Sequence, residues 1–274
     1  MYCFLGVIVL DYIKKDSYGF NDLVEIMKIL RSPEGCPWDR EQDHKSIRQN
    51  FIEETYEAIE AIDTEDSELL KEELGDVLLQ VVFHSEIEQS QGGFNIDDVC
   101  DGVCKKLIVR HPHVFGDIVA ETSDKVLTNW DNIKMKTKSQ KTQSDAIDSV
   151  AKSLPALMRS TKVQQKAAKV GFDWDDVNGA MEKVSEELSE LKEAVKSSDK
   201  ENIHEELGDL LFAVVNVSRF LKEDSEKALY DACDKFAKRF RKVEELASEK
   251  DINMKEAGIE VLDELWDEAK KISN

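Results

Sequence analysis

Four carboxylates in this chain form a spaced set that occurs twice. In each set two glutamates lie three residues apart, and sixteen residues later a third glutamate is followed, again after three residues, by an aspartate. The two sets are Glu54, Glu57, Glu73 and Asp76, and Glu187, Glu190, Glu206 and Asp209. Because residues three apart share one face of a helix, each pair directs both carboxylates to the same side. Two such helices lying side by side would bring four carboxylates together.

Clustered carboxylate oxygens favour one kind of chemistry. They select a hard divalent cation, Mg²⁺ or Mn²⁺, over zinc or copper. Mg²⁺ that is held only partly by protein oxygens keeps water ligands and commonly binds substrate phosphates. The pattern therefore predicts a Mg²⁺ site, with Mn²⁺ as a second option, that acts on a phosphorylated substrate. The alternative is a pair of solvated helix faces, because Glu-rich helices are common.

The helix expected around Glu73 and Asp76 is apolar on nearly its whole circumference, through the Leu, Val and Phe residues between positions 69 and 83. A helix that is apolar all round is a buried helix. A buried ionised carboxylate is costly unless it is paired or bound to a metal. Neither residues 54–57 nor residues 73–76 include a Lys or Arg. The surroundings thus favour a metal site over solvated faces.

An internal duplication organises the chain. The sequence Glu-Glu-Leu-Gly-Asp occurs at residues 72–76 and again at 205–209, and the same ungapped offset of 133 aligns the carboxylate pairs that precede it. The polar stretch around residues 137–148 is a natural linker between the halves. We therefore expect an N-terminal domain at 20–136, a linker at 137–149 and a C-terminal domain at 150–274.

Each half is expected to consist of helices, and no segment shows sustained period-2 alternation. The first half predicts helices at 47–62, 69–87 and 95–110, and the second at 184–195, 203–221 and 225–248. Asp66 is the expected N-cap of the 69–87 helix, and Ser198 or Asp199 that of the 203–221 helix. The predicted fold class is all-α.

Composition narrows the classes of function. The chain has 274 residues, and its 58 Asp and Glu against 37 Lys and Arg leave a net charge of −21. This balance argues against nucleic acid and against anionic membrane as partners. The five cysteines form no CxxC pair, and the apolar run at the N-terminus is too short to span a bilayer. These features predict a cytoplasmic protein.

The carboxylate sets and the segments around them resemble the MazG-type nucleoside triphosphate pyrophosphohydrolases, whose pattern is E-x-x-E followed after a loop by E-x-x-D. The flanking segments that agree are Gly-Cys-Pro-Trp-Asp at 35–39, Arg-His-Pro-His-Val-Phe at 110–115, Val-Gly-Phe-Asp-Trp at 170–174 and Lys-Phe-Ala-Lys-Arg-Phe-Arg at 235–241. The resemblance extends over almost the whole chain beyond about residue 20. It implies two tandem MazG-like helical-bundle domains and a homodimer.

The resemblance also implies an activity: Mg²⁺-dependent hydrolysis of nucleoside triphosphates to nucleoside monophosphate and pyrophosphate, in nucleotide-pool house-cleaning or a stress response. It implies four substrate contacts: Lys183, Lys235, Arg239 and Trp266. The three cations would bind phosphate, and the indole would face the base or sugar. Glu186, beside the expected metal ligand Glu187, is a candidate for positioning or deprotonating the attacking water. Glu186, Glu187, Lys235 and Arg239 are the expected catalytic residues.

The two halves differ in their positive charges. At the offset of 133, Lys183 corresponds to Asn50 and Lys235 to Gly102, whereas Arg239 corresponds to Lys106. We therefore expect the C-terminal domain to be the main catalytic domain. The first half is then a weaker, regulatory or structural copy, and a working first site is the alternative.

Two further functions compete with this one. A non-catalytic helical dimerisation or regulatory protein could bind divalent metal only to stabilise its fold. A di-iron oxidoreductase would need ExxH on facing helices. The ExxH spacings at Glu41 and His44 and at Glu201 and His204 do not recur in the opposite half. The di-iron alternative is therefore disfavoured.

Overall fold

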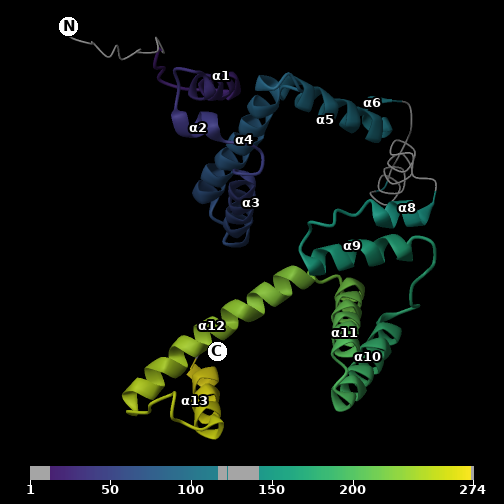
Figure 1. Cartoon of the computed structure of the whole chain (residues 1–274). Coiled ribbons are helices and arrows are strands. Elements are labelled where there is room, and N and C mark those ends of the chain that lie inside the picture. The colour runs from purple at the N-terminus through teal and green to yellow at the C-terminus, as the bar shows by residue number, and fades with distance from the viewer. Residues whose placement is uncertain (1–12, 117–121, 123–141, 273–274) are drawn as a thin grey trace. The chain divides into compact units, whose positions relative to one another are not determined.

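The computed structural model describes residues 13–116, 122 and 142–272, and all regular secondary structure within them is helical. The all-α prediction is confirmed. The described residues divide into two compact units, one within residues 1–133 and the other within 134–274 (Figure 1). In the described part of the chain, no helix is long and apolar enough to cross a membrane.

The first unit is built on a helical hairpin. Its helices are α1 Phe20–Arg31, α2 Pro37–Glu41, α3 Arg48–Asp63, α4 Ser67–Ser90, α5 Ile96–Arg110 and α6 Pro112–Phe115. The short turn between α3 and α4 makes them antiparallel neighbours. α1 packs on α4, and a buried cluster that includes Met27, Phe83 and Ile87 joins them. This cluster holds α4, which carries two of the predicted ligands.

The second unit repeats the hairpin. Its helices are α8 Gln143–Asp148, α9 Ala156–Ala168, α10 Val177–Ser197, α11 Lys200–Leu221, α12 Ser225–Glu249 and α13 Ile259–Ile272. α10 and α11 form the hairpin, α9 packs on α11, and α13 packs on α12 around Val243, Leu246 and Leu265. Residues 143–148 of the expected linker form α8, which packs on α9 and buries Ala146. Residues 137–141 of that linker lie outside the described part.

Matching aspartates begin the second helix of each hairpin. Asp66 accepts hydrogen bonds from the backbone N–H groups of Glu68 and Leu69, at 3.1 and 3.0 Å. Asp199 does the same for Glu201 and Asn202, at 3.1 and 3.2 Å. Such caps satisfy N–H groups that the helix itself leaves unpaired. The N-cap prediction at Asp66 is confirmed, and Asp199 is the N-cap of α11.

The segment before α10 is tied to the end of α11. The Arg219 guanidinium donates to both carboxylate oxygens of Asp173, at 2.9 Å for the longer contact. The Trp174 ring lies against Gly179, where an added Cβ would come within 2.9 Å of the ring. Only glycine admits so close an approach without a shift of the ring. These contacts fix the start of α10 against α11.

The expectation that the 69–87 helix is buried all round is wrong for the single chain. Leu74 and Leu78 of α4 are 53% and 39% exposed, and Leu207 and Leu211 of α11 are 46% and 52% exposed. The facing helices add further exposed apolar side chains: Tyr56, Ile59 and Ile62 on α3, and Met181, Leu188 and Val195 on α10. Two helices bury only the faces they turn to each other and to their neighbours. Each hairpin therefore leaves an apolar face uncovered.

Candidate metal centre

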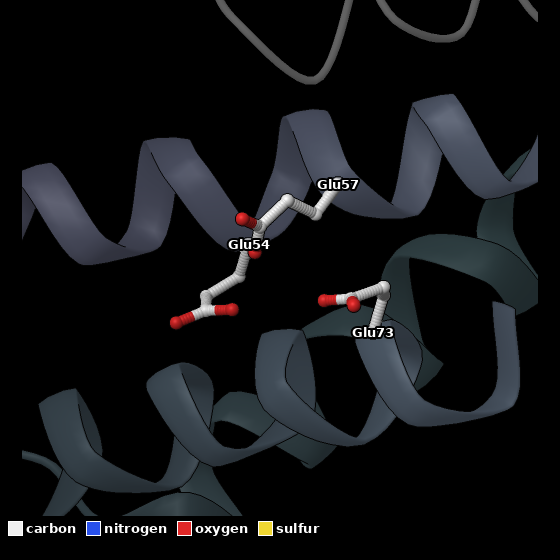
Figure 2. A group of neighbouring side chains, drawn as sticks. All are labelled: Glu54, Glu57 and Glu73. Atoms are coloured by element: carbon white, nitrogen blue, oxygen red, sulfur yellow. The ribbon is translucent and has the colours of Figure 1, made fainter. Parts of the chain in front are cut away.

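The first hairpin brings three of its four predicted ligands together. Glu54 and Glu57 project from α3 and Glu73 from α4, into the space between the two helices (Figure 2). Each of the three offers a carboxylate oxygen that lies within 4.8 Å of the others. Three oxygens at this separation can ligate one cation together.

The surroundings of this group disfavour its negative charge. Glu73 is only 9% exposed. Burial raises the pKa of Glu73, and the negative charges of Glu57 and Asp76 raise it further. Burial also raises the pKa of Glu54, again with added repulsion from Asp76 and Glu57. Repulsion between carboxylates is what a bound divalent cation relieves.

The second hairpin repeats the arrangement. Glu187 and Glu190 from α10 and Glu206 from α11 offer oxygens within 4.8 Å of one another, and Glu187 is 5% exposed. Burial raises the pKa of Glu190. A hydrogen bond with Glu187 and the negative charge of Glu187 raise this pKa further. Burial and the charge of Glu187 likewise raise the pKa of Glu206. The two groups share the same residue types, the same spacing and the same repulsion between partly buried carboxylates.

The fourth carboxylate of each predicted set lies outside the group of three. Asp76 and Asp209 are not among the groups whose oxygens all lie within 4.8 Å. Their negative charges nevertheless act on the group, because Asp76 raises the pKa of Glu54 and Asp209 raises the pKa of Glu206. Each group is therefore three close carboxylates with a fourth at its margin.

A lysine distinguishes the second group. The Lys183 Nζ lies 2.8 Å from Glu186 Oε1 and 2.6 Å from Glu187 Oε1. Hydrogen bonds to both carboxylates raise the pKa of Lys183. The family resemblance implies that Lys183 contacts the substrate, and its pairing with Glu186 and Glu187 was not predicted. The signal was available, because residues three and four apart on a helix lie next to each other.

The other expected substrate residues lie on a different pair of helices. Lys235 and Arg239 lie on α12 and Trp266 on α13, where the indole ring lies 5.0 Å from the Phe236 ring, centroid to centroid. Among the described residues, no hydrogen bond, ion pair or ring contact joins these three side chains to the carboxylates of α10 and α11. Within the part of the chain that the structure describes, Lys183 contacts Glu186 and Glu187, whereas the three side chains on α12 and α13 have no such contact with the carboxylates.

The histidines do not contribute to either group, so the ExxH spacings find no support within the described residues. His44 instead joins a network that the sequence analysis missed. Its Nδ1 lies 2.8 Å from His84 Nδ1, and its Nε2 lies 2.9 Å from Glu88 Oε1. Forty residues separate the two histidines, so no local spacing could have indicated the contact. The network ties the segment before α3 to α4.

Comparison with known proteins agrees with the duplicated site. Residues 42–115 and 176–245 each match the family model of the MazG nucleotide pyrophosphohydrolase domain. The nucleoside triphosphate pyrophosphohydrolase/pyrophosphatase MazG of Thermotoga maritima is 49% identical over 251 residues, which cover 92% of this chain and 95% of that protein. The nucleoside triphosphate pyrophosphohydrolase of Escherichia coli K12 is 44% identical over 252 residues, covering 91% and 96%. Each match to the family model contains one carboxylate group.

Proposed function

Because this chain belongs to the MazG nucleotide pyrophosphohydrolase family, we propose that it hydrolyses nucleoside triphosphates to a nucleoside monophosphate and pyrophosphate, with Mg²⁺ as cofactor. The observation that carries the proposal is the three-carboxylate group, present once in each family match. Relatives that share almost their whole length with this chain are named for the same activity.

The residues present fit a hard divalent cation. All three donors of each group are carboxylates, the ligand type that Mg²⁺ and Mn²⁺ prefer. Burial, and then repulsion from neighbouring carboxylates, raises the pKa values of Glu54, Glu73, Glu190 and Glu206. A bound Mg²⁺ would polarise phosphate oxygens and lower the pKa of a bound water. Glu187, Glu190 and Glu206, with Asp209 at the margin, would hold it in the second unit.

The protein's own residues then have distinct roles. Glu186 is exposed beside the buried Glu187 and accepts a hydrogen bond from Lys183. Once Lys183 moves to the phosphate, the Glu186 carboxylate can orient the attacking water and accept its proton. Lys183 binds phosphate oxygens from the same helix. Lys235 and Arg239 add positive charge for a substrate with about four negative charges. Trp266 offers a flat face to the base or sugar.

We assign the main reaction to the second unit. Glu187 and its neighbours have Lys183 within hydrogen-bond distance. The first unit has Asn50 at the equivalent position and Gly102 where the second has Lys235. Without these cations the first group can hold a metal but binds a triphosphate less well. We therefore propose that it serves as a weaker, regulatory or structural copy. The domain ranges 20–136 and 150–274, joined at 137–149, remain our assignment.

We further propose that the protein acts as a homodimer. Each hairpin exposes an apolar face, with Leu74 and Leu78 on α4 and Leu207 and Leu211 on α11. Exposed apolar faces of this kind mark interaction surfaces, and a second copy offers the same faces in return. Sedimentation equilibrium of the full chain tests this, and Leu211→Glu should shift a dimer toward monomer. A monomeric wild type would contradict it.

The biological role follows from the reaction. Removal of a triphosphate from the nucleotide pool suits house-cleaning or a stress response, in the cytoplasm. The proposal requires neither nucleic acid nor membrane as a partner, and a net charge of −21 disfavours both.

Product analysis tests the reaction. The purified full-length chain is incubated with a mixture of nucleoside triphosphates and Mg²⁺, with and without EDTA, and the products are separated by anion exchange. We expect nucleoside monophosphate and pyrophosphate only when Mg²⁺ is free. Nucleoside diphosphate with orthophosphate would contradict the cleavage position. No turnover by folded protein that still binds Mg²⁺ would favour a metal-stabilised scaffold instead.

A further inference from the structure

We propose that Lys183 is a built-in counter-ion that occupies the cation position of the second carboxylate group when no metal is bound. In this role it weakens the binding of a divalent cation there relative to the first group. The inference rests on the proposed metal-dependent function and adds to it: the duplication has produced two sites of different metal affinity. The difference follows from one residue.

The geometry places the lysine on a predicted ligand. Its Nζ lies 2.6 Å from Glu187 Oε1, and the side chain of Glu187 is only 6% exposed against 37% for Lys183. Glu187 also belongs to the group whose oxygens lie within 4.8 Å of one another. The ammonium and an incoming metal ion therefore compete for the same buried carboxylate. Charge-assisted hydrogen bonds to a buried partner are stronger than those at the surface.

A second pair on the same helix shows the contrast. Lys196 and Glu193 of α10 also form an ion pair, at 2.6 Å, but their side chains are 71% and 73% exposed. Such a solvated ion pair contributes little to stability. Neither Lys196 nor Glu193 belongs to the carboxylate group. The pair formed by Lys183 is distinct because it reaches into the metal-binding group.

The first group has no such partner. The residue equivalent to Lys183 is Asn50, which is neutral. Within the described residues, no ion pair reaches Glu54, Glu57 or Glu73. A cation entering the first group has no cationic side chain of the described residues to displace, whereas one entering the second must first displace an ammonium group from Glu187. The first group is therefore the tighter metal site.

The displaced ammonium group stays close to the site. Lys183 lies on α10 one turn before Glu187, so after metal entry its charge remains next to the cation. It is then free to bind an anion that arrives with the metal, as a triphosphate does. The second group thus prefers a metal–anion pair over metal alone, while the first favours the metal itself.

Mn²⁺ binding without substrate tests the proposal, with the signal of free Mn²⁺ measured by electron paramagnetic resonance. The protein is the full-length chain in which Glu54→Gln and Glu57→Gln silence the first group, and circular dichroism confirms folding. In this background Lys183→Asn should tighten Mn²⁺ binding by about 10-fold, since a charged hydrogen bond and a competing charge are both lost. Lys183→Arg should keep the weaker affinity.

Lys196→Asn is the matched control, because it removes the same charge from the same helix outside the group. It should leave the Mn²⁺ affinity unchanged. Tightening of equal size in Lys196→Asn would overturn the proposal, since the loss of any positive charge on α10 would then be enough to tighten Mn²⁺ binding. Unchanged or weaker binding in Lys183→Asn would overturn it as well.

The reciprocal change tests the first group and does not depend on the folding of Lys183→Asn. In the otherwise unmodified first unit, with Glu187→Gln and Glu190→Gln silencing the second, Asn50→Lys should weaken Mn²⁺ binding by about 10-fold. Asn50→Met, of similar length and no charge, should not. Equal effects of Lys and Met would overturn the proposal. A wild-type chain that binds no Mn²⁺ would refute the proposed function itself.

Discussion

The hairpins α3–α4 and α10–α11 hold the same three glutamates at the same spacing, yet they differ in the charge next to them. In the first, Glu54, Glu57 and Glu73 have no cationic partner among the described residues. In the second, Lys183 bridges Glu186 and Glu187. The duplication therefore kept the carboxylates that we propose hold a metal, and changed the positive charge that we propose binds an anionic substrate. Similar ligands alone do not make two sites equivalent.

The largest difference between the hairpins should appear in catalysis. We expect Glu190→Gln to lower turnover of nucleoside triphosphates by about 100-fold, because a ligand to the catalytic cation is lost. Glu57→Gln, at the equivalent position, should leave turnover close to that of the wild type. Steady-state rates at saturating Mg²⁺ give the comparison.

Glu193→Gln is the control for this pair, since Glu193 is an exposed residue of α10 outside the carboxylate group. It should have wild-type turnover. Losses of equal size in Glu57→Gln and Glu190→Gln would mean that both units catalyse the reaction, which would remove the functional difference between the hairpins.

A smaller and equal effect is expected at the helix caps. Asp66→Ala and Asp199→Ala each remove a side chain that accepts two backbone hydrogen bonds. Each should lower the free energy of unfolding by about 1 kcal/mol. Calorimetry should show the loss in the transition of the unit that carries the change, if the two units melt separately.

The Asn variants at the same positions separate the cap from other effects. Because Asn caps a helix about as well as Asp, Asp66→Asn and Asp199→Asn should be close to the wild type in stability. A large loss in either Asn variant would show that the negative charge, and not the hydrogen bonds, matters at that position.

The smallest effect is expected from the titration of a single carboxylate without metal. Burial and neighbouring charges raise the pKa of Glu73 above its ordinary value of 4.5. The folded state then holds its proton over a range in which the unfolded state releases it, so stability declines as the pH rises from 4.5 through the raised pKa. In EDTA at pH 8, Glu73→Gln should therefore raise the melting temperature.

The same variant should have a much smaller effect near pH 4, where Glu73 is mostly protonated in both states. With Mg²⁺ at pH 8 the sign should reverse, because the wild type gains from metal binding and the variant loses a ligand. Differential scanning fluorimetry at the two pH values measures this. A variant that is destabilised in EDTA at pH 8 would contradict the electrostatic account of the first group.

The family and the helices could be predicted from local features. The i, i+3 spacing of Glu187 and Glu190 places both on one helix face whatever surrounds it, and apolar runs bounded by Asp66 and Asp199 predict where α4 and α11 begin. A capping side chain and a face depend on residues within one turn, so they are readable from the sequence. The repeat at an offset of 133 showed that two such units exist.

Contacts between helices were harder to predict from the sequence. The apolar circumference of α4 predicted burial on all sides, yet Leu74 and Leu78 are exposed. Hydropathy indicates that a helix face is stabilised by apolar contact, but it does not indicate whether a helix of the same chain covers that face. The pairing of His44 with His84 crosses forty residues. Whether Lys235 and Arg239 contact the carboxylates depends on the direction in which α12 leaves α11, and among the described residues no such contact forms.

The helices, the duplication and the residue types of both carboxylate groups can be read along the chain, since they depend on local spacing. Tertiary structure alone decided that three carboxylates of each set, and not four, meet within 4.8 Å. It also decided that His44 meets His84, forty residues away along the chain. The physical reason is that register and rotamer across a helix pair place atoms to within a few ångströms, and a linear pattern does not contain that information.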